Sequence, residues 1–273
     1  MTTLTVPAVS AVPAEAEQGA IAERFERDGF CPLPGVLAPG ECAALRAALD
    51  RAFANPGLAD THNRYGDIVM CRLFELDPLF LELLTREPFI SLAERILGPH
   101  CHLVANNAVV NPSGKAIDGW HVDEHLLFPL PEGIERHDAR LRMPICQFTF
   151  QILLSDVLDE THGPTQFVPA SHYAGRHPPP KTAAPKFDGR GPVSMYARAG
   201  DAYLHNGQCW HRGAPNSSGD TRYLLQMHFG MRWVAQRFYP FMHYRLPEWV
   251  EARTRDDARL RRVLGFHGKG PYG

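Results

Sequence analysis

Three residues with metal-binding side chains stand where one site could combine them. His121 and Asp123 are two positions apart in the run Gly119–Asp123. Side chains two apart on an extended strand project to the same face, so a strand here would aim an imidazole and a carboxylate at one point. His211 offers a third ligand if the fold brings it near. Two histidines and one carboxylate around an ion leave its other side open, as in the facial triad of non-haem Fe(II) oxygenases.

Arg222 adds a permanent cation shortly after His211 in the sequence. Its flat guanidinium fork matches the geometry of a carboxylate. A doubly charged Fe(II) ion, the Asp123 carboxylate, a doubly negative 2-oxo dicarboxylate and Arg222 sum to zero charge. A dry pocket tolerates a neutral set far better than a bare charge. The four residues therefore favour a metal site that also binds a carboxylate.

The order of these and neighbouring motifs resembles the phytanoyl-CoA dioxygenase family of Fe(II)- and 2-oxoglutarate-dependent oxygenases, from about Phe25 to the C-terminus. An HxD motif alone is common by chance, whereas the ordered set is specific. The matching elements are His121-Val122-Asp123, Gly163-Pro164-Thr165, Pro169-Ala170-Ser171-His172, Gly200-Asp201, Trp210-His211, Pro215-Asn216-Ser217, Arg222 and Leu264-Gly265-Phe266-His267.

The resemblance implies a role for each site residue. The Fe(II) ligands would be His121, Asp123 and His211. Arg222 would pair with the distal carboxylate of 2-oxoglutarate, Thr165 and Gln151 would help to hold this cosubstrate, and O2 would take the last open position. The expected reaction is hydroxylation of a small molecule, with succinate and CO2 as co-products; ketone formation, desaturation and epoxidation are the other outcomes.

Two positions refine this expectation. Asp123 stands where related halogenases have a small residue, so the resemblance implies oxygenation rather than halogenation. Gly213 stands two residues after the distal histidine, where the family often has a hydroxyl residue, so that contact with the cosubstrate is missing here.

The substrate-contact candidates are His125, Trp210 and Trp233. His125 would share the face of His121 on a continued strand and contact the substrate or a metal ligand, or else face water at the rim. The tryptophans would wall the pocket or belong to the core. The run Trp210–Ser217 resembles family members that tailor bacterial natural products, so we expect a substrate of that kind.

Other classes of function remain open on the residues alone. A facial site also suits a metal-dependent, cupin-like hydrolase or isomerase, and a small-molecule binder without redox turnover. Arg222 argues against both, because neither needs a carboxylate clamp at that position. A helical zinc site on His121 and His125 lacks the glutamate of HExxH.

The elements that must position these residues change in kind along the chain. Helical periodicity predicts helices over 15–28, 38–54, 79–84 and 89–97, and short strands without intervening helices follow from Cys101. Pro144–Ser155 is a nearly continuous apolar strand. This order argues against Rossmann and TIM folds and fits a mainly β jelly roll. The resemblance likewise implies a cupin-like double-stranded β-helix with flanking helices.

We expect residues 1–15 to form a disordered arm and 16–273 a single dioxygenase domain, with its β-helix core at about 100–240. The proline-rich stretch 175–192 predicts a long loop of the kind that forms lids. Arg64 and Tyr65 either line a substrate entrance or lie at the surface, which we favour.

Composition limits the partners. The formal charge is −2, which argues against a nucleic-acid-binding surface. No apolar run is long enough for a transmembrane helix, and the N-terminus lacks the features of a signal peptide, so we expect a cytoplasmic protein. The six cysteines show no CxxC spacing and are expected to be free thiols.

Overall fold

The structure, a computed structural model, describes residues 13–59, 62–65, 67–123, 125–138, 140–238 and 245–268. Most of the expected N-terminal arm, residues 1–12, lies outside these ranges. The α-helices are α1 (Glu15–Asp28), α2 (Pro39–Phe53), α3 (Pro78–Leu83), α4 (Phe89–Leu97), α5 (Glu248–Thr254) and α6 (Ala258–Val263). The strands are β1 (Phe30–Leu33), β2 (Asn63–Arg64), β3 (Val69–Cys71), β4 (His102–Asn111), β5 (Gln147–Leu153), β6 (Thr165–Phe167), β7 (Val193–Ser194), β8 (Ala202–His205), β9 (His211–Gly213) and β10 (Arg222–Gly230).

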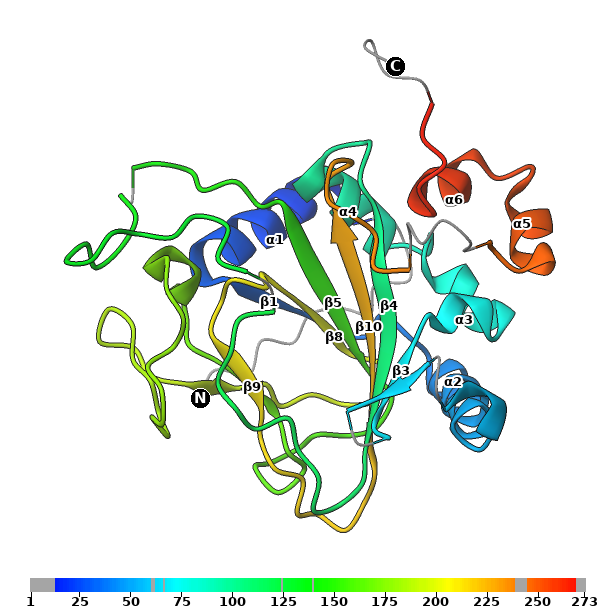
Figure 1. Ribbon diagram of the computed structural model, residues 1–273, viewed down its shortest axis with the longest axis horizontal. Helices are drawn as coiled ribbons and strands as arrows, with labels where there is room; N and C mark the ends of the chain where they lie inside the picture. The colour runs from blue at the N-terminus through cyan, green and yellow to red at the C-terminus, as the bar shows by residue number, and fades with distance from the viewer. Residues whose placement is uncertain are drawn as a thin grey trace.

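Two antiparallel sheets form the body of the molecule. The larger has seven strands in the order β1-β8-β5-β10-β4-β3-β2, and the smaller has three in the order β7-β6-β9. Figure 1 shows the helices gathered along one side of the large sheet, while β9 and the long loops lie on the other side. The expected mainly β jelly roll with flanking helices is confirmed. No α-helix among the described residues is both long and apolar enough to span a membrane.

Local sequence signals begin the helices that cover the large sheet. Helix α2 starts with Pro39 in its first turn, and the Glu41 carboxylate accepts the Ala38 amide at 2.7 Å. Helix α3 follows Asp77, whose side chain accepts the Leu79 amide at 3.0 Å. Both are start signals because the free amides of a helix N-terminus need acceptors.

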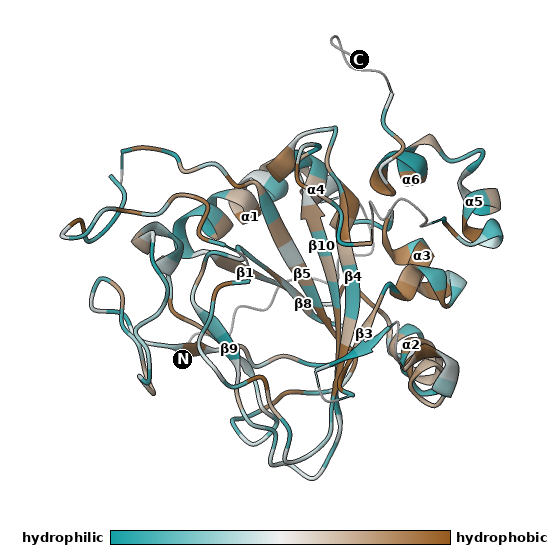
Figure 2. Ribbon diagram, in the orientation of Figure 1, coloured by the Kyte–Doolittle hydropathy of each residue, from teal (hydrophilic) through white to brown (hydrophobic). Residues whose placement is uncertain are grey.

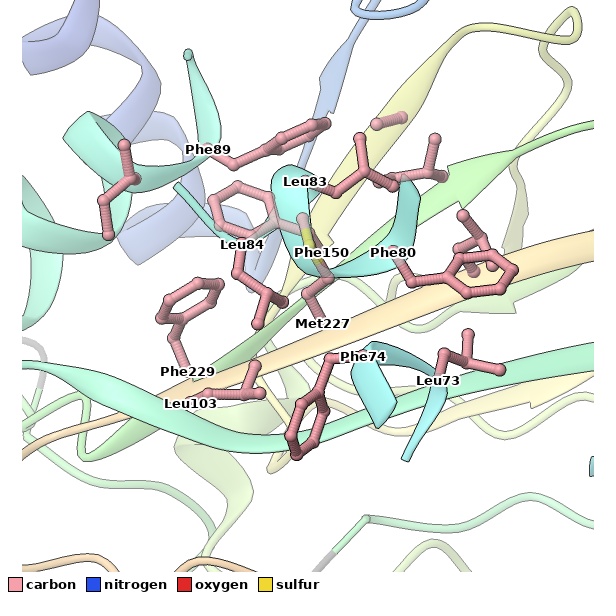
Figure 3. Packing of buried hydrophobic residues seen from close by; sticks show 14 of the residues in the cluster. Leu73, Phe74, Phe80, Leu83, Leu84, Phe89, Leu103, Phe150, Met227 and Phe229 are labelled. Atoms are coloured by element: carbon pink, nitrogen blue, oxygen red, sulfur yellow. The ribbon is translucent and has the colours of Figure 1, made fainter. Parts of the chain in front are cut away.

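The outer face of the large sheet is apolar and packs against the helices. On β10 the outward residues are Leu225, Met227 and Phe229, and on β5 they include Phe148 and Phe150. All five are at most 1% exposed. Figure 3 shows Phe150, Met227 and Phe229 meeting side chains of α3 and α4. In Figure 2 the colour changes along the central strands between apolar and polar positions, as expected when only one face is dry.

The inner face is organised in rows, because neighbouring strands are paired in register. An apolar row contains Val69, Val109, Leu224 and Leu153 on four adjacent strands. The next row is polar and runs through Asn107, Gln226, Gln151 and Tyr203. A third row holds His228, Thr149 and His205. Inward polar groups on a central sheet need partners or a ligand.

Candidate functional site

The structure brings His121, Asp123 and His211 into one cluster. Their candidate ligand atoms all lie within 4.8 Å of one another. Asp123 Oδ1 is 3.3 Å from His211 Nε2 and 3.9 Å from His121 Nε2. Among the described residues this is the group of histidine, cysteine and carboxylate side chains spaced to hold a metal ion.

The backbone that aligns this cluster differs from the expected strand. His121 forms only an isolated antiparallel bridge to His211, through two backbone hydrogen bonds of 3.0 Å. The amide of Asp123 donates to the carbonyl of Gly207 at 2.8 Å. The expectation of a continuous strand here was therefore wrong. The shared direction of the side chains comes from pairing with the segment that carries His211.

Hydrogen bonds to backbone carbonyls set the tautomers of both histidines. His121 Nδ1 lies 2.7 Å from the carbonyl of Gly119, and His211 Nδ1 lies 2.8 Å from that of Cys209. A carbonyl only accepts, so each Nδ1 carries a proton, and Nε2 is the nitrogen of each ring that faces Asp123 and would be available to a metal ion. Burial lowers the pKa of His121, which favours the neutral ring. Burial also acts to lower the pKa of His211, but the charge of Asp123 outweighs it and raises that pKa.

His205 is a site residue that sequence reasoning missed. It is fully buried, and its Nε2 lies 3.1 Å from Asp123 Oδ2. Burial lowers the pKa of His205 to about 4, so the ring is neutral and Nε2–H donates to the carboxylate. Burial acts to raise the pKa of Asp123, but the charge of His211 and the His205 hydrogen bond hold it well below its usual range. The inward alternation of Tyr203 and His205 on β8 was the signal that could have found it.

A cavity of about 380 Å³ opens beside this cluster. Its lining comprises Tyr65, Val69, Asn107, Val109, Ile117, His121, Val122, Asp123, Gln151, Thr165, His211, Arg212, Gly213, Arg222, Leu224, Gln226, His228 and Arg237. The expected cosubstrate residues Arg222, Thr165 and Gln151 are all present. Tyr65, which we expected at the surface, is 75% exposed and lies at the cavity mouth.

Arg222 is a buried cation with unused donors. It is 7% exposed, and Nη1 donates to the carbonyl of Gly163. The buried Nε has no hydrogen-bond partner within the described part of the chain. Burial lowers its pKa. A β-carbon at Gly213 would lie 3.3 Å from Arg222 Nη2, so the glycine leaves room for the guanidinium. The cavity thus combines an open metal-binding group with an unpaired carboxylate-binding group, and the two fit Fe(II) and 2-oxoglutarate.

Tyr203, which was not among the predicted site residues, connects Thr165 and Gln151 by hydrogen bonds. The hydroxyl of Tyr203 lies 2.6 Å from both Thr165 Oγ1 and Gln151 Oε1. The amide Nε2 of Gln151 is 3.4 Å from His205 Nδ1. Hydrogen bonds therefore run from this polar group through His205 to Asp123.

The three substrate-contact candidates do not line the cavity. Trp210 is 2% exposed and packs with Val122 and Phe187, because adjacent residues of an extended chain face opposite ways and His211 takes the cavity side. Trp233 is 68% exposed in the turn after β10. The side chain of His125 is exposed, and its carbonyl accepts from Gln208. Contact of these three residues with a substrate therefore has no support from the cavity and stays a prediction.

The 175–192 loop is attached beside the metal-binding cluster. Trp120 Nε1 donates to the carbonyl of Ala183 at 3.1 Å, and Trp210 Nε1 donates to that of Arg176 at 2.8 Å. Phe187 is buried in the same apolar group as Trp210. The loop is therefore attached, through Trp120 and Trp210, to the two segments that carry the metal-binding residues.

The sequence matches the family model described as Phytanoyl-CoA dioxygenase (PhyH) over residues 25–224. A curated relative, the ectoine dioxygenase of Bordetella bronchiseptica, is 27% identical over 164 residues, which cover 55% of this chain and 48% of that protein. The aligned part thus spans about half the length of that relative.

Solved structures share the fold. The non-haem α-ketoglutarate-dependent epimerase SnoN from nogalamycin biosynthesis is 22% identical with a TM-score of 0.61, covering 80% of this chain and 84% of its own. HygX from Streptomyces hygroscopicus, with nickel, 2-oxoglutarate and hygromycin B bound, is 18% identical with a TM-score of 0.61, covering 82% and 90%.

Proposed function

Because the chain belongs to the phytanoyl-CoA dioxygenase family, we propose that it is an Fe(II)- and 2-oxoglutarate-dependent dioxygenase that hydroxylates a small molecule. One observation carries the proposal. The buried Arg222, whose Nε lacks a partner, lines the same cavity as the metal-binding cluster. A metal-dependent hydrolase, or an isomerase that works without 2-oxoglutarate, has no need of this carboxylate clamp.

Each site residue then has one task. His121, Asp123 and His211 hold the metal, and Arg222 binds the distal carboxylate of 2-oxoglutarate. Thr165 and Gln151 line the same cavity and would offer hydrogen bonds to the cosubstrate. When bound, Fe(II) and 2-oxoglutarate supply the activation of O2 and the oxidation of a substrate C–H bond, with release of succinate and CO2.

The rest of the site orients these groups and excludes water. The His205 Nε2–H bond occupies Asp123 Oδ2, so Oδ1, which faces the two histidines, is the oxygen left for the metal. A carboxylate held through one oxygen leaves more of the open side of the ion for other ligands. The apolar row of Val69, Val109 and Leu224 covers the floor beside Arg222 and keeps that end of the cavity dry.

A role in bacterial natural-product biosynthesis is the finer part of the proposal. It is supported by the likeness in fold to SnoN, solved with Fe3+, α-ketoglutarate and nogalamycin RO, and to HygX, solved with hygromycin B. Both are enzymes whose ligands are complex small molecules. We extend only that general class of ligand to this chain.

The test is a spectroscopic titration of anaerobic protein with Fe(II) and 2-oxoglutarate. Chelation of the metal at an open facial site should produce a weak visible charge-transfer band, together with succinate formation once O2 is admitted. Asp123→Ala should abolish the band and Arg222→Ala should weaken it. Arg253→Ala, which removes an exposed arginine paired with Glu82, is the matched control and should leave the band unchanged.

The opposite result is equally clear. Folded, iron-loaded protein that gives neither a band nor succinate would remove 2-oxoglutarate from the function. Zinc-dependent hydrolysis and simple ligand binding would then be measured instead.

A further inference from the structure

The inner face of the large sheet carries more hydrogen-bonding groups than the metal cluster and Arg222 use. Asn107 and Gln226 are direct neighbours across β4 and β10, and His228 follows two residues after Gln226. Residues two apart on a strand share a face. All three line the cavity. Gln226 and His228 lie on the part of β10 beyond Leu224 from Arg222, and Asn107 lies opposite Gln226 on β4.

These three side chains have unused hydrogen-bonding capacity. Neither the Asn107 nor the Gln226 amide hydrogen-bonds to another described residue. His228 is 6% exposed; its Nδ1 lies 2.8 Å from Thr149 Oγ1, and its buried Nε2 has no partner. A buried polar atom without a partner destabilises a fold, and most such atoms in proteins are satisfied. An unpartnered imidazole nitrogen at a cavity wall therefore points to a ligand.

The charges around the cavity restrict the chemistry of that ligand. Among the described lining residues Asp123 is the sole carboxylate, and it belongs to the metal cluster. A cationic ligand would thus find no counter-charge. The lining also holds three arginines. Arg222 is assigned to the cosubstrate, and Arg212 donates to Gln166 at 2.7 Å and lies over the Trp120 ring. Arg237 likewise has an interaction partner, so an anionic ligand would compete for each of the three. An apolar ligand would leave the two amides and the imidazole without hydrogen-bond partners. The site should therefore discriminate strongly against such a ligand.

We propose that Asn107, Gln226 and His228 form the substrate subsite, and that the substrate presents uncharged hydroxyl groups on a compact ring, as in a cyclitol or sugar. Amides and a neutral imidazole both donate and accept, which suits hydroxyl groups. The cavity is near the lower end of the usual ligand-pocket range and is shared with the cosubstrate, so one compact ring of the substrate fits inside it and any larger part would extend through the mouth. The exposed Tyr65 offers an aromatic face at the mouth. This inference rests on the proposed function.

The experiment uses four six-membered-ring probes that differ in charge and polarity. They are myo-inositol (neutral, hydroxylated), 2-deoxystreptamine (cationic), quinate (anionic) and cyclohexanol (mostly apolar). Each is titrated up to about 100 mM into anaerobic full-length protein with Fe(II) and 2-oxoglutarate, and the change in the charge-transfer band and the shift in Tm are recorded. We expect myo-inositol to respond first, with millimolar half-saturation as for a small fragment.

Matched variants connect the response to the subsite. Asn107→Leu and Gln226→Leu should each weaken myo-inositol binding about tenfold, because each leaves a hydroxyl unpaired. Gln18→Leu, the same kind of change on α1 outside the cavity, should have no effect. Asn107→Asp, which keeps the shape and adds a charge, should shift the preference to 2-deoxystreptamine. The Tm of each variant without probe reports its folding.

The outcomes separate this inference from the proposed function. Wild-type protein with a normal band that prefers another probe, or responds to none, overturns the substrate class and leaves the dioxygenase assignment standing. An unchanged myo-inositol response in both leucine variants overturns the subsite. Absence of the band itself, with iron-loaded folded protein, counts against the proposed function.

Discussion

Strand β10 shows two regions of the molecule side by side, because its alternate residues face opposite environments. Leu225, Met227 and Phe229 point outward into a dry layer beneath the helices. Arg222 and Gln226 point inward to the cavity. The outward residues pack among apolar neighbours, whereas Arg222 Nε has no hydrogen-bond partner among the residues that the structure describes.

The difference indicates which face of the sheet stabilises the fold and which face binds ligands. Burial of apolar surface stabilises the outer layer, while unpaired polar groups on the inner face lower stability in the absence of a ligand. A change on the outer face should therefore affect unfolding, and one on the inner face should affect binding. The following predictions test that division, from the largest effect to the smallest.

Phe150→Ala should reduce the free energy of unfolding by about 3–5 kcal/mol. Phe150 is fully buried and packs edge-on against Phe89, Phe148 and Phe229, so its removal leaves a cavity in the outer layer. Urea denaturation measures the loss. The fraction that remains folded should still show the 2-oxoglutarate band. Loss of the band from folded protein would contradict the idea that the outer face affects stability alone.

Arg222→Ala should show the reverse pattern. Removing one side of a buried charge pair weakens 2-oxoglutarate binding by roughly 100-fold. The unfolding free energy without cosubstrate should fall by less than about 1 kcal/mol, because a buried cation with unused donors adds little stability. Titration of the band and urea denaturation measure the two quantities. A loss of stability as large as that of Phe150→Ala would assign Arg222 to the fold rather than to the cosubstrate.

His205→Phe should weaken Co(II) or Fe(II) binding roughly 10–100-fold, the usual effect of removing a hydrogen bond to a metal ligand. The free Asp123 Oδ2 could then also reach the metal, so the visible spectrum of bound Co(II) should change. His205→Gln retains an N–H donor and is the control that should recover most of the affinity. Equal affinity and identical spectra in all three proteins would leave His205 as core packing.

A histidine outside the cavity should give a smaller, acid-dependent effect. Burial lowers the pKa of His172 to about 4, while its Nε2 lies 2.9 Å from the Glu26 carbonyl. His172 therefore binds a proton more readily in the unfolded chain than in the folded one. The free energy of unfolding falls as the pH decreases from the ordinary histidine pKa of about 6.5 toward 4.

Between about pH 7 and pH 5 we expect His172 to account for a loss of about 2 kcal/mol in the free energy of unfolding. His172→Gln retains a donor for Glu26 and should flatten this part of the profile. Urea denaturation of both proteins across that range measures the difference. If the two proteins lose the same stability as the pH falls, a group other than His172 causes the acid sensitivity.

Much of the site was predictable because its signals are local. The His121-Val122-Asp123 run, the distal His211 and the later Arg222 could be recognised by residue type and order, and the structure gathers them around one cavity. The alternation along β10 would also have allowed the prediction of an inward row that begins at Arg222. Gln226 and His228 belong to that row, so the same period could have identified them.

Other parts of the site depend on pairing between distant segments. Trp210 and Trp233 were plausible pocket walls by residue type, but packing buried the first and left the second at the surface. His205 looks like any strand histidine in the sequence, and only the approach of Gly207 to the Asp123 backbone brings its ring to the carboxylate.

The sequence by itself determined the family, the jelly roll, and the residues suited to a metal and a carboxylate. These follow from side-chain chemistry and from the two-residue period of a strand, which local order specifies. Only the tertiary structure decided which carboxylate oxygen of Asp123 accepts the hydrogen bond from His205, and which polar groups share the cavity. Such contacts join residues far apart in the chain, and their geometry results from the packing of all the strands together.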